Sequence, residues 1–160
     1  MICLNNLYKF MYFLALDLGT TTGWAVGSTN PKRHCQSGTQ NFKPTRYQSH
    51  GQRYVEFKNF IANIHSRYNL SYCYYEEVRK HIGTDAAHIY GGYVATLQAW
   101  CIENNIEYAG TPVGTIKKHI TGKGNAGKDD VILAVKQRLN LFPKDHNEAD
   151  AIALCDYHLT

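Results

Sequence analysis

The stretch that decides the fold is residues 12–26, which read YFLALDLGTTTGWAV. Its first part is apolar up to Asp17, a Gly/Thr turn follows, and its last part is again small or apolar. This order predicts a buried strand, a turn and a second strand that pairs back on the first. A carboxylate at the end of a buried strand is costly unless a cation or donor pairs with it. Gly19 and Gly23 leave room for a bulky, charged group to approach the backbone. The alternative is that Asp17 is only the cap of the turn.

The rest of the chain continues with one more strand and then with alternating helices and strands. The expected strands are residues 12–18, 22–28, 34–42, 71–76 and 106–111, and the expected helices are 52–68, 84–103, 112–120, 128–139 and 147–158. A hairpin followed by such alternation predicts an α/β three-layer fold with a mixed five-stranded sheet and flanking helices. Gly91 and Gly92 interrupt the second helix at about 1 kcal/mol each relative to Ala, which indicates close packing against another element.

Composition bounds the class of protein. The chain has 160 residues, which is enough for one domain with a core. We expect a loose extension at residues 1–11 and a single domain over residues 12–160, with Met11 as the functional start. The formal net charge of +4 permits nucleic-acid binding without establishing it. The apolar stretch 10–18 is too short to span a bilayer and ends in an acid, which argues against a signal peptide.

The five cysteines are scattered and include no CxxC pair. This pattern favours reduced thiols in a cytoplasmic protein over a disulfide framework or a zinc site.

Three acids from distant segments are candidates for one metal site. Glu76 and Glu77 end the fourth expected strand, and alternation places only one of them on each face. Asp150 lies among small residues in the last helix, so that helix can lie close to the sheet. Asp17, Glu76 and Asp150 brought together would repel one another, and two Mg²⁺ ions about 4 Å apart would neutralise them and clamp a phosphate. We expect Glu77 and Glu148 to be solvated surface acids, and separate caps remain the alternative for Asp17 and Asp150.

Basic residues form a second group within residues 117–128. Its members are Lys117, Lys118, His119, Lys123 and Lys128, interspersed with three glycines. Flexible glycines with spaced lysines suit phosphate contacts, although a mobile solvated loop has the same composition. Arg79 and Lys80 directly follow the strand that ends at Glu76 and Glu77, and would add positive charge beside the acids.

These residues together resemble the RuvC-type Holliday-junction resolvases. The resemblance rests on Asp17, Glu76 and Asp150 with the segments 115–117 and 122–128, and it covers residues 12–158. The stretches EVRKH and DAAHIYGG are most similar to phage or prophage members. The resemblance implies an RNase H-like fold, a homodimer formed through the helix at 84–103, and metal-dependent hydrolysis of DNA at four-way junctions.

The resemblance also implies roles for single residues. Asp17, Glu76 and Asp150 would be catalytic metal ligands for two Mg²⁺ ions, with Mn²⁺ able to replace them. The family's fourth ligand, an Asp or His, corresponds to Asn147, and neighbouring His146 is the other candidate. Lys117 and Lys128 would be catalytic and contact phosphate. The remaining DNA-binding residues would be Arg79, Lys80, Lys118 and Lys123.

Other functions share parts of this pattern. An actin-like ATPase has a similar opening motif but needs two lobes and a second phosphate loop. A RuvC-like ribonuclease that trims structured RNA shares the fold and the first Asp. A non-catalytic junction-binding module would be consistent with Asn147 in place of an acid. All of these remain open at the level of sequence, as do the preferred cut sequence and the biological setting.

Overall fold

Strand β1 (Tyr12–Asp17) and strand β2 (Thr21–Thr29) form the antiparallel hairpin that the sequence predicts. They belong to a computed structural model that describes residues 11–81 and 83–160. Of the loose extension expected over residues 1–11, residues 1–10 lie outside the described residues.

The hairpin is the centre of a mixed five-stranded sheet. The other strands are β3 (Lys32–Asn41), β4 (Tyr72–Glu77) and β5 (Glu107–Pro112), in the order β3-β2-β1-β4-β5. β3 pairs antiparallel with β2, whereas β4 is parallel to both β1 and β5. The predicted mixed sheet is therefore confirmed, with strand ends within two residues of those expected.

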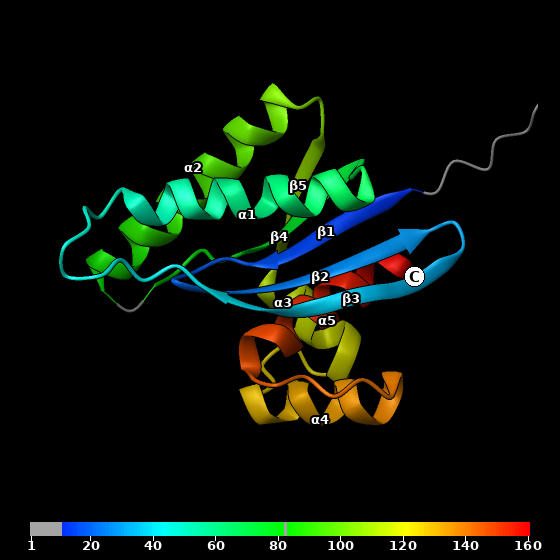
Figure 1. The fold of residues 1–160 in the computed structure, drawn as a ribbon. Coiled ribbons are helices and arrows are strands. Elements are labelled where there is room, and N and C mark those ends of the chain that lie inside the picture. Colours follow the sequence, from blue (N-terminus) through cyan, green and yellow to red (C-terminus); the bar gives the residue numbers. More distant parts are fainter. Residues whose placement is uncertain (1–10, 82) are drawn as a thin grey trace, which may run out of the picture.

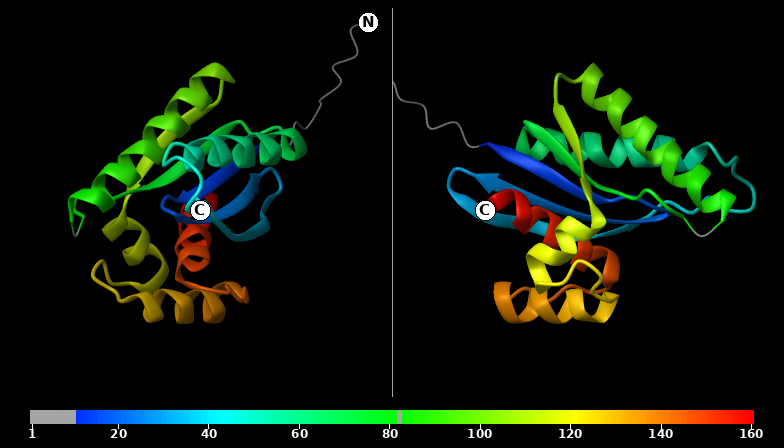
Figure 2. Two further views of the ribbon diagram at one scale, coloured as in Figure 1. Left: turned by 60° about the vertical axis from the view of Figure 1, so that its left-hand side comes forward. Right: turned by 180° about the vertical axis from the view of Figure 1, so that it is seen from behind.

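Helices cover both faces of the sheet and make three layers (Figures 1 and 2). Helices α1 (Gln52–Tyr68) and α2 (Thr84–Glu103) lie on one face. Helices α3 (Val113–Thr121), α4 (Lys128–Leu139) and α5 (His146–Leu159) lie on the other, with α4 outermost. No helix in the described part of the chain is long and apolar enough to cross a membrane.

The alternation of β1 divides its side chains between two hydrophobic cores. Leu14 and Leu16 pack with the side chains of α1 and α2. Phe13 and Ala15 pack on the other face with α5 and parts of α3 and α4. Because side chains alternate along a strand, Asp17 continues the row of Phe13 and Ala15 on the side of α5.

Glycines mark two places where a helix approaches closely. A Cβ on Gly23 in β2 would overlap the backbone carbonyl of Asn147, so α5 begins directly on the sheet. The expectation that Gly23 leaves space for an external charged group is therefore wrong, because the protein's own helix fills that space. A Cβ on Gly92 would overlap the Tyr54 ring of α1, which confirms close packing there, whereas Gly91 faces open space.

Candidate active site

The three predicted acids meet at one edge of the sheet. The register that pairs Leu16 of β1 with Tyr75 of β4 sets Asp17 beside Glu76, at the ends of parallel neighbours. Asp150 comes from the second turn of α5, which lies on β2 and β1. One carboxylate oxygen from each acid lies within 4.8 Å of those from the other two.

Glu148 fixes the start of the helix that carries Asp150. Its carboxylate accepts a hydrogen bond from the Ser37 hydroxyl at 2.7 Å and one from the Lys144 N–H at 2.8 Å. Its own N–H donates to the Asp145 carboxylate at 2.9 Å, which caps α5. The expectation of a solvated surface acid is wrong here, since Glu148 is only 6% exposed. The sequence gives no sign that Glu148 is buried, because its partner Ser37 lies 111 residues away in the chain.

A tyrosine holds the end of β4 in place. The Tyr90 hydroxyl of α2 donates to the backbone carbonyl of Glu76 at 2.8 Å and accepts from the Val78 N–H at 3.1 Å. These bonds fix the backbone on both sides of Glu77 and direct Glu76 toward α5. Sequence reasoning placed Tyr90 only on an apolar helix face, since its hydroxyl has no local partner to reveal the second role.

Burial disfavours the ionised form of all three acids, and neighbouring carboxylates add to this effect at Asp17 and Glu76. Burial, and then the charges of Glu76 and Asp150, hold the pKa of Asp17 well above its usual range. Burial and the Asp150 charge raise the pKa of Glu76 to about 7. Burial raises the pKa of Asp150 to about 6, with Lys117 and Lys128 opposing the change. Three carboxylates placed in this way could hold a divalent cation, which would favour their ionised forms.

The acids open into a groove of about 970 Å³, which four predicted cationic residues also line. They are Lys117, Lys128, Arg79 and Lys80. Lys117 and Lys128 are close enough to lower the pKa of both Glu76 and Asp150. Arg79 also pairs with Glu77, with 3.8 Å between its Nε and the Glu77 Oε1.

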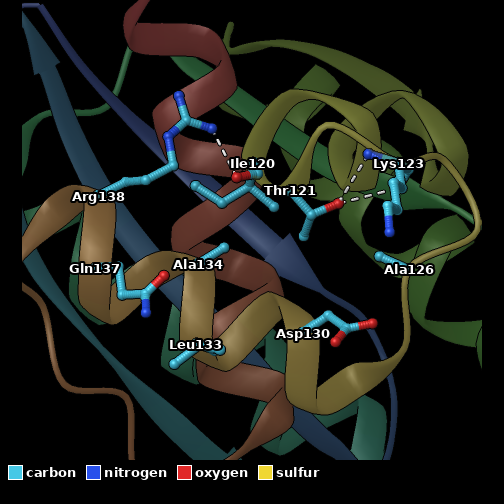
Figure 3. A pocket seen from close by; sticks show the side chains of 9 residues that line it. All are labelled: Ile120, Thr121, Lys123, Ala126, Asp130, Leu133, Ala134, Gln137 and Arg138. Atoms are coloured by element: carbon cyan, nitrogen blue, oxygen red, sulfur yellow. Dashed lines mark hydrogen bonds between the residues drawn. The ribbon is translucent and has the colours of Figure 1, made fainter.

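Two of the predicted DNA-binding lysines lie away from this groove. Lys118 is exposed on α3 and does not line it. Lys123 lines a separate cavity of about 280 Å³ between α3 and α4 (Figure 3). Its backbone N–H and carbonyl both bond the Thr121 hydroxyl, which folds the glycine-rich loop back on the end of α3.

Asn147 and His146 differ in what they face. Asn147 lines the groove with Asp150, one helical turn before it. The His146 ring instead lies 2.9 Å from the Asp129 carboxylate at the start of α4. Of the two candidates for a fourth ligand, only Asn147 lines the groove that the acids share, whereas His146 pairs with Asp129 and still helps to lower the pKa of Asp150.

The donor set fits a hard divalent cation. Its carboxylate and amide oxygens are the ligands that Mg²⁺ prefers, and the groove gives room for waters and a phosphate beside them. The raised pKa values of Asp17, Glu76 and Asp150 are consistent with a site that a cation would complete.

Comparisons with known proteins agree with the geometry. A family model described as crossover junction endodeoxyribonuclease RuvC matches residues 14–158. The chain is 32% identical to a protein of that name from Ehrlichia canis over 153 residues, covering 91% of this chain and 95% of the relative. It is 29% identical to the one from Rhodopirellula baltica over 156 residues, covering 91% and 85%.

Solved structures show the same fold. The structure of Thermus thermophilus RuvC in complex with a Holliday junction substrate has a TM-score of 0.76 at 19% identity, and the match covers 91% of this chain and 90% of that one. The family match excludes the actin-like ATPase and implies dependence on a divalent metal. Since the family model spans nearly the whole described chain, the protein belongs to the RuvC family of crossover junction endodeoxyribonucleases, the Holliday-junction resolvases with an RNase H-like fold.

Proposed function

We propose that this protein resolves four-way DNA junctions by hydrolysing one phosphodiester in each of two symmetric strands. The observation that carries the proposal is the convergence of Asp17, Glu76 and Asp150 in a groove that cationic side chains also line. The relative from Thermus thermophilus was solved with a Holliday junction substrate, which supports branched DNA as the partner here.

The acids, with Asn147, would hold two Mg²⁺ ions, for which Mn²⁺ can substitute. When bound, the ions supply an activated water and stabilise the charge on the leaving oxygen. Asp17 and Glu76 would provide the most buried ligands, and Asp150 and Asn147 those on α5. An amide oxygen adds no negative charge, so we expect metal binding to be weaker than with a fourth acid.

The cations of the groove would act on the DNA itself. Lys117 and Lys128 would contact non-bridging phosphate oxygens near the cut and stabilise negative charge in the transition state. Arg79 and Lys80 at the same groove would position the backbone. Lys118 and Lys123, which lie outside the groove, would contribute only general attraction for DNA.

A homodimer matches a junction that has two symmetric strands to cut. The outer face of α2 supports this assembly, because an exposed apolar stripe runs along it at helical spacing. The stripe consists of Gly91, Ala95, Ala99 and Ile102. Ile102 is 67% exposed, whereas Leu97 and Trp100 of the same helix already pack in the core.

We place the enzyme in the cytoplasm of a bacterium or phage-infected host, in keeping with its free Cys73, Cys101 and Cys155.

Cleavage of matched substrates tests the proposal. We would compare a four-way DNA junction, a linear duplex of the same sequence and a structured RNA, each with Mg²⁺, Mn²⁺ or Ca²⁺. We expect paired cuts in the junction with Mg²⁺ or Mn²⁺, and binding without cleavage with Ca²⁺. Asp17→Asn should abolish cleavage and preserve binding, whereas Glu107→Gln, at the far end of β5, should behave as wild type.

Each alternative predicts a different outcome. Preferential cleavage of RNA would identify a RuvC-like ribonuclease instead. Junction binding without cleavage in any metal would identify a non-catalytic binding module. Cleavage by Asp17→Asn at the wild-type rate would rule out the assigned metal site.

A further inference from the structure

Arg53, in the first turn of α1, is a buried cation without a counter-ion. Its side chain is only 7% exposed. No ion pair in the described part of the chain includes it. Its Nη1 donates to the Thr20 hydroxyl at 3.3 Å, and its Nε has no hydrogen-bond partner. A buried charge whose partners are the neutral hydroxyls of Thr20 and Tyr93 is costly, so this guanidinium is short of an anion.

Arg53 lines a cavity in which the charged residues are all basic. The cavity has a volume of about 270 Å³ and lies under the loop between β3 and α1. Its other basic residues are Lys43, Arg46 and His50, and no acid lines it. The N-terminus of α1 adds positive potential beside the cavity, and no acidic residue in its first turn offsets that potential. The cavity therefore attracts an anion from several directions.

The cavity borders the turn that follows Asp17. Thr20, which accepts the Arg53 hydrogen bond, is three residues after that acid. The Thr20 carbonyl accepts from the Phe42 N–H at 2.8 Å, which ties the β3–α1 loop to the same turn. Figures 1 and 2 show this loop, the β1–β2 turn and the start of α2 gathered at one end of the molecule.

We propose that the Arg53 cavity binds a phosphate of the DNA backbone outside the segment that is cut. This inference rests on the proposed function for its choice of DNA as the source of the phosphate. Tyr47, beside the cavity, is 84% exposed and lies under the Arg46 guanidinium at 4.7 Å. An exposed aromatic ring next to a phosphate site is typical of nucleic-acid binding, and a free anion would make no use of it.

The first arm of the test measures binding of the four-way junction with Ca²⁺ at several salt concentrations. The variant is the double Lys43→Gln, Arg46→Gln, since both side chains are exposed and their removal leaves the core intact. The matched control is Lys58→Gln, Arg67→Gln, which removes two exposed charges from the body of α1. We expect the cavity variant to lose about tenfold in affinity and about one unit in the slope of log K against log salt. The control should match wild type.

The second arm uses inorganic phosphate and needs no DNA. Phosphate should raise the melting temperature of wild type above that in chloride of equal ionic strength. This rise should vanish in Arg53→Gln and shrink in the double variant. Arg53→Gln is used only in this second arm. The rise in melting temperature that phosphate causes can still be measured even if the variant is less stable than wild type.

The outcomes separate cleanly. Equal affinity and salt slope for the cavity variant and the control would overturn the assignment to DNA, whatever phosphate does. A phosphate effect that persists in Arg53→Gln would show that the anion binds elsewhere and would overturn the cavity as the site. Failure of wild type to cut the junction would refute the proposed function instead. The first arm, run on any DNA that wild type binds, and the second arm, which needs no DNA, would still decide whether the cavity binds phosphate.

Discussion

Replacing Glu76 by Gln should stabilise the metal-free protein at alkaline pH while removing cleavage. Burial and the Asp150 charge raise the pKa of Glu76 from 4.5 to about 7. The folded protein therefore binds this proton more tightly than the unfolded chain. The contribution of this proton to the free energy of unfolding is fully present below the pKa of the unfolded chain, near 4.5. It is lost as the pH rises through the pKa of the folded protein, about 7.

The size of this change in stability follows from the difference between the folded and unfolded pKa values of Glu76. At about 1.4 kcal/mol per pKa unit, ionised Glu76 destabilises the metal-free fold by about 3 kcal/mol above the folded pKa. Glutamine has the same shape without the charge. Near pH 8.5 the metal-free Glu76→Gln variant should therefore be more stable than wild type by about 3 kcal/mol. Near pH 5, where folded Glu76 is protonated, the gain should fall below about 1 kcal/mol.

Urea unfolding of both proteins in EDTA, at both pH values, measures this difference. Glu77→Gln is the matched control, because the Glu77 carboxylate lies outside the cluster of three acids and pairs with exposed Arg79. Adding Mg²⁺ should stabilise wild type much more than Glu76→Gln, since the ion binds the ionised acid. Equal stability of wild type and Glu76→Gln in EDTA at pH 8.5 would refute the reasoning.

Four further predictions test other parts of the molecule. Lys117→Ala should lower the single-turnover cleavage rate at saturating enzyme at least about tenfold, which is about 1.4 kcal/mol in the activation free energy. Lys123→Ala should only weaken DNA binding and reduce the salt dependence of that binding. If both variants changed affinity equally and neither changed the cleavage rate, Lys117 would not be a catalytic residue. Asn147→Asp should reduce severalfold the Mg²⁺ concentration that gives half-maximal cleavage, since it adds a charged ligand, and an unchanged requirement in a metal titration would argue against Asn147 as a ligand. Glu148→Ala should destabilise the fold by about 2 kcal/mol, because two donors lose a buried acceptor, and a change below about 0.5 kcal/mol in urea unfolding would contradict this. Ala95→Glu should turn a dimer into a monomer in light scattering at micromolar concentration, and a dimer that persists would place the interface elsewhere.

Much of the fold was readable from local pattern. The apolar runs and helical spacing gave all five strands and five helices close to their observed ends. Period-two alternation also explained why only Glu76 of the adjacent pair Glu76 and Glu77 joins Asp17. These features depend on near neighbours in the chain, which is why sequence alone predicts them.

What the sequence by itself determined is thus the order of elements and the positions of the acids at strand and helix ends. Tertiary structure alone decided that α5 fills the space over Gly23, that Glu148 is buried against Ser37, and that His146 turns to Asp129. It also buried Arg53 without an ion pair among the described residues and set it beside Thr20. Each of these depends on which distant segments pack together. A side chain's burial and partners come from those contacts, and no local periodicity encodes them.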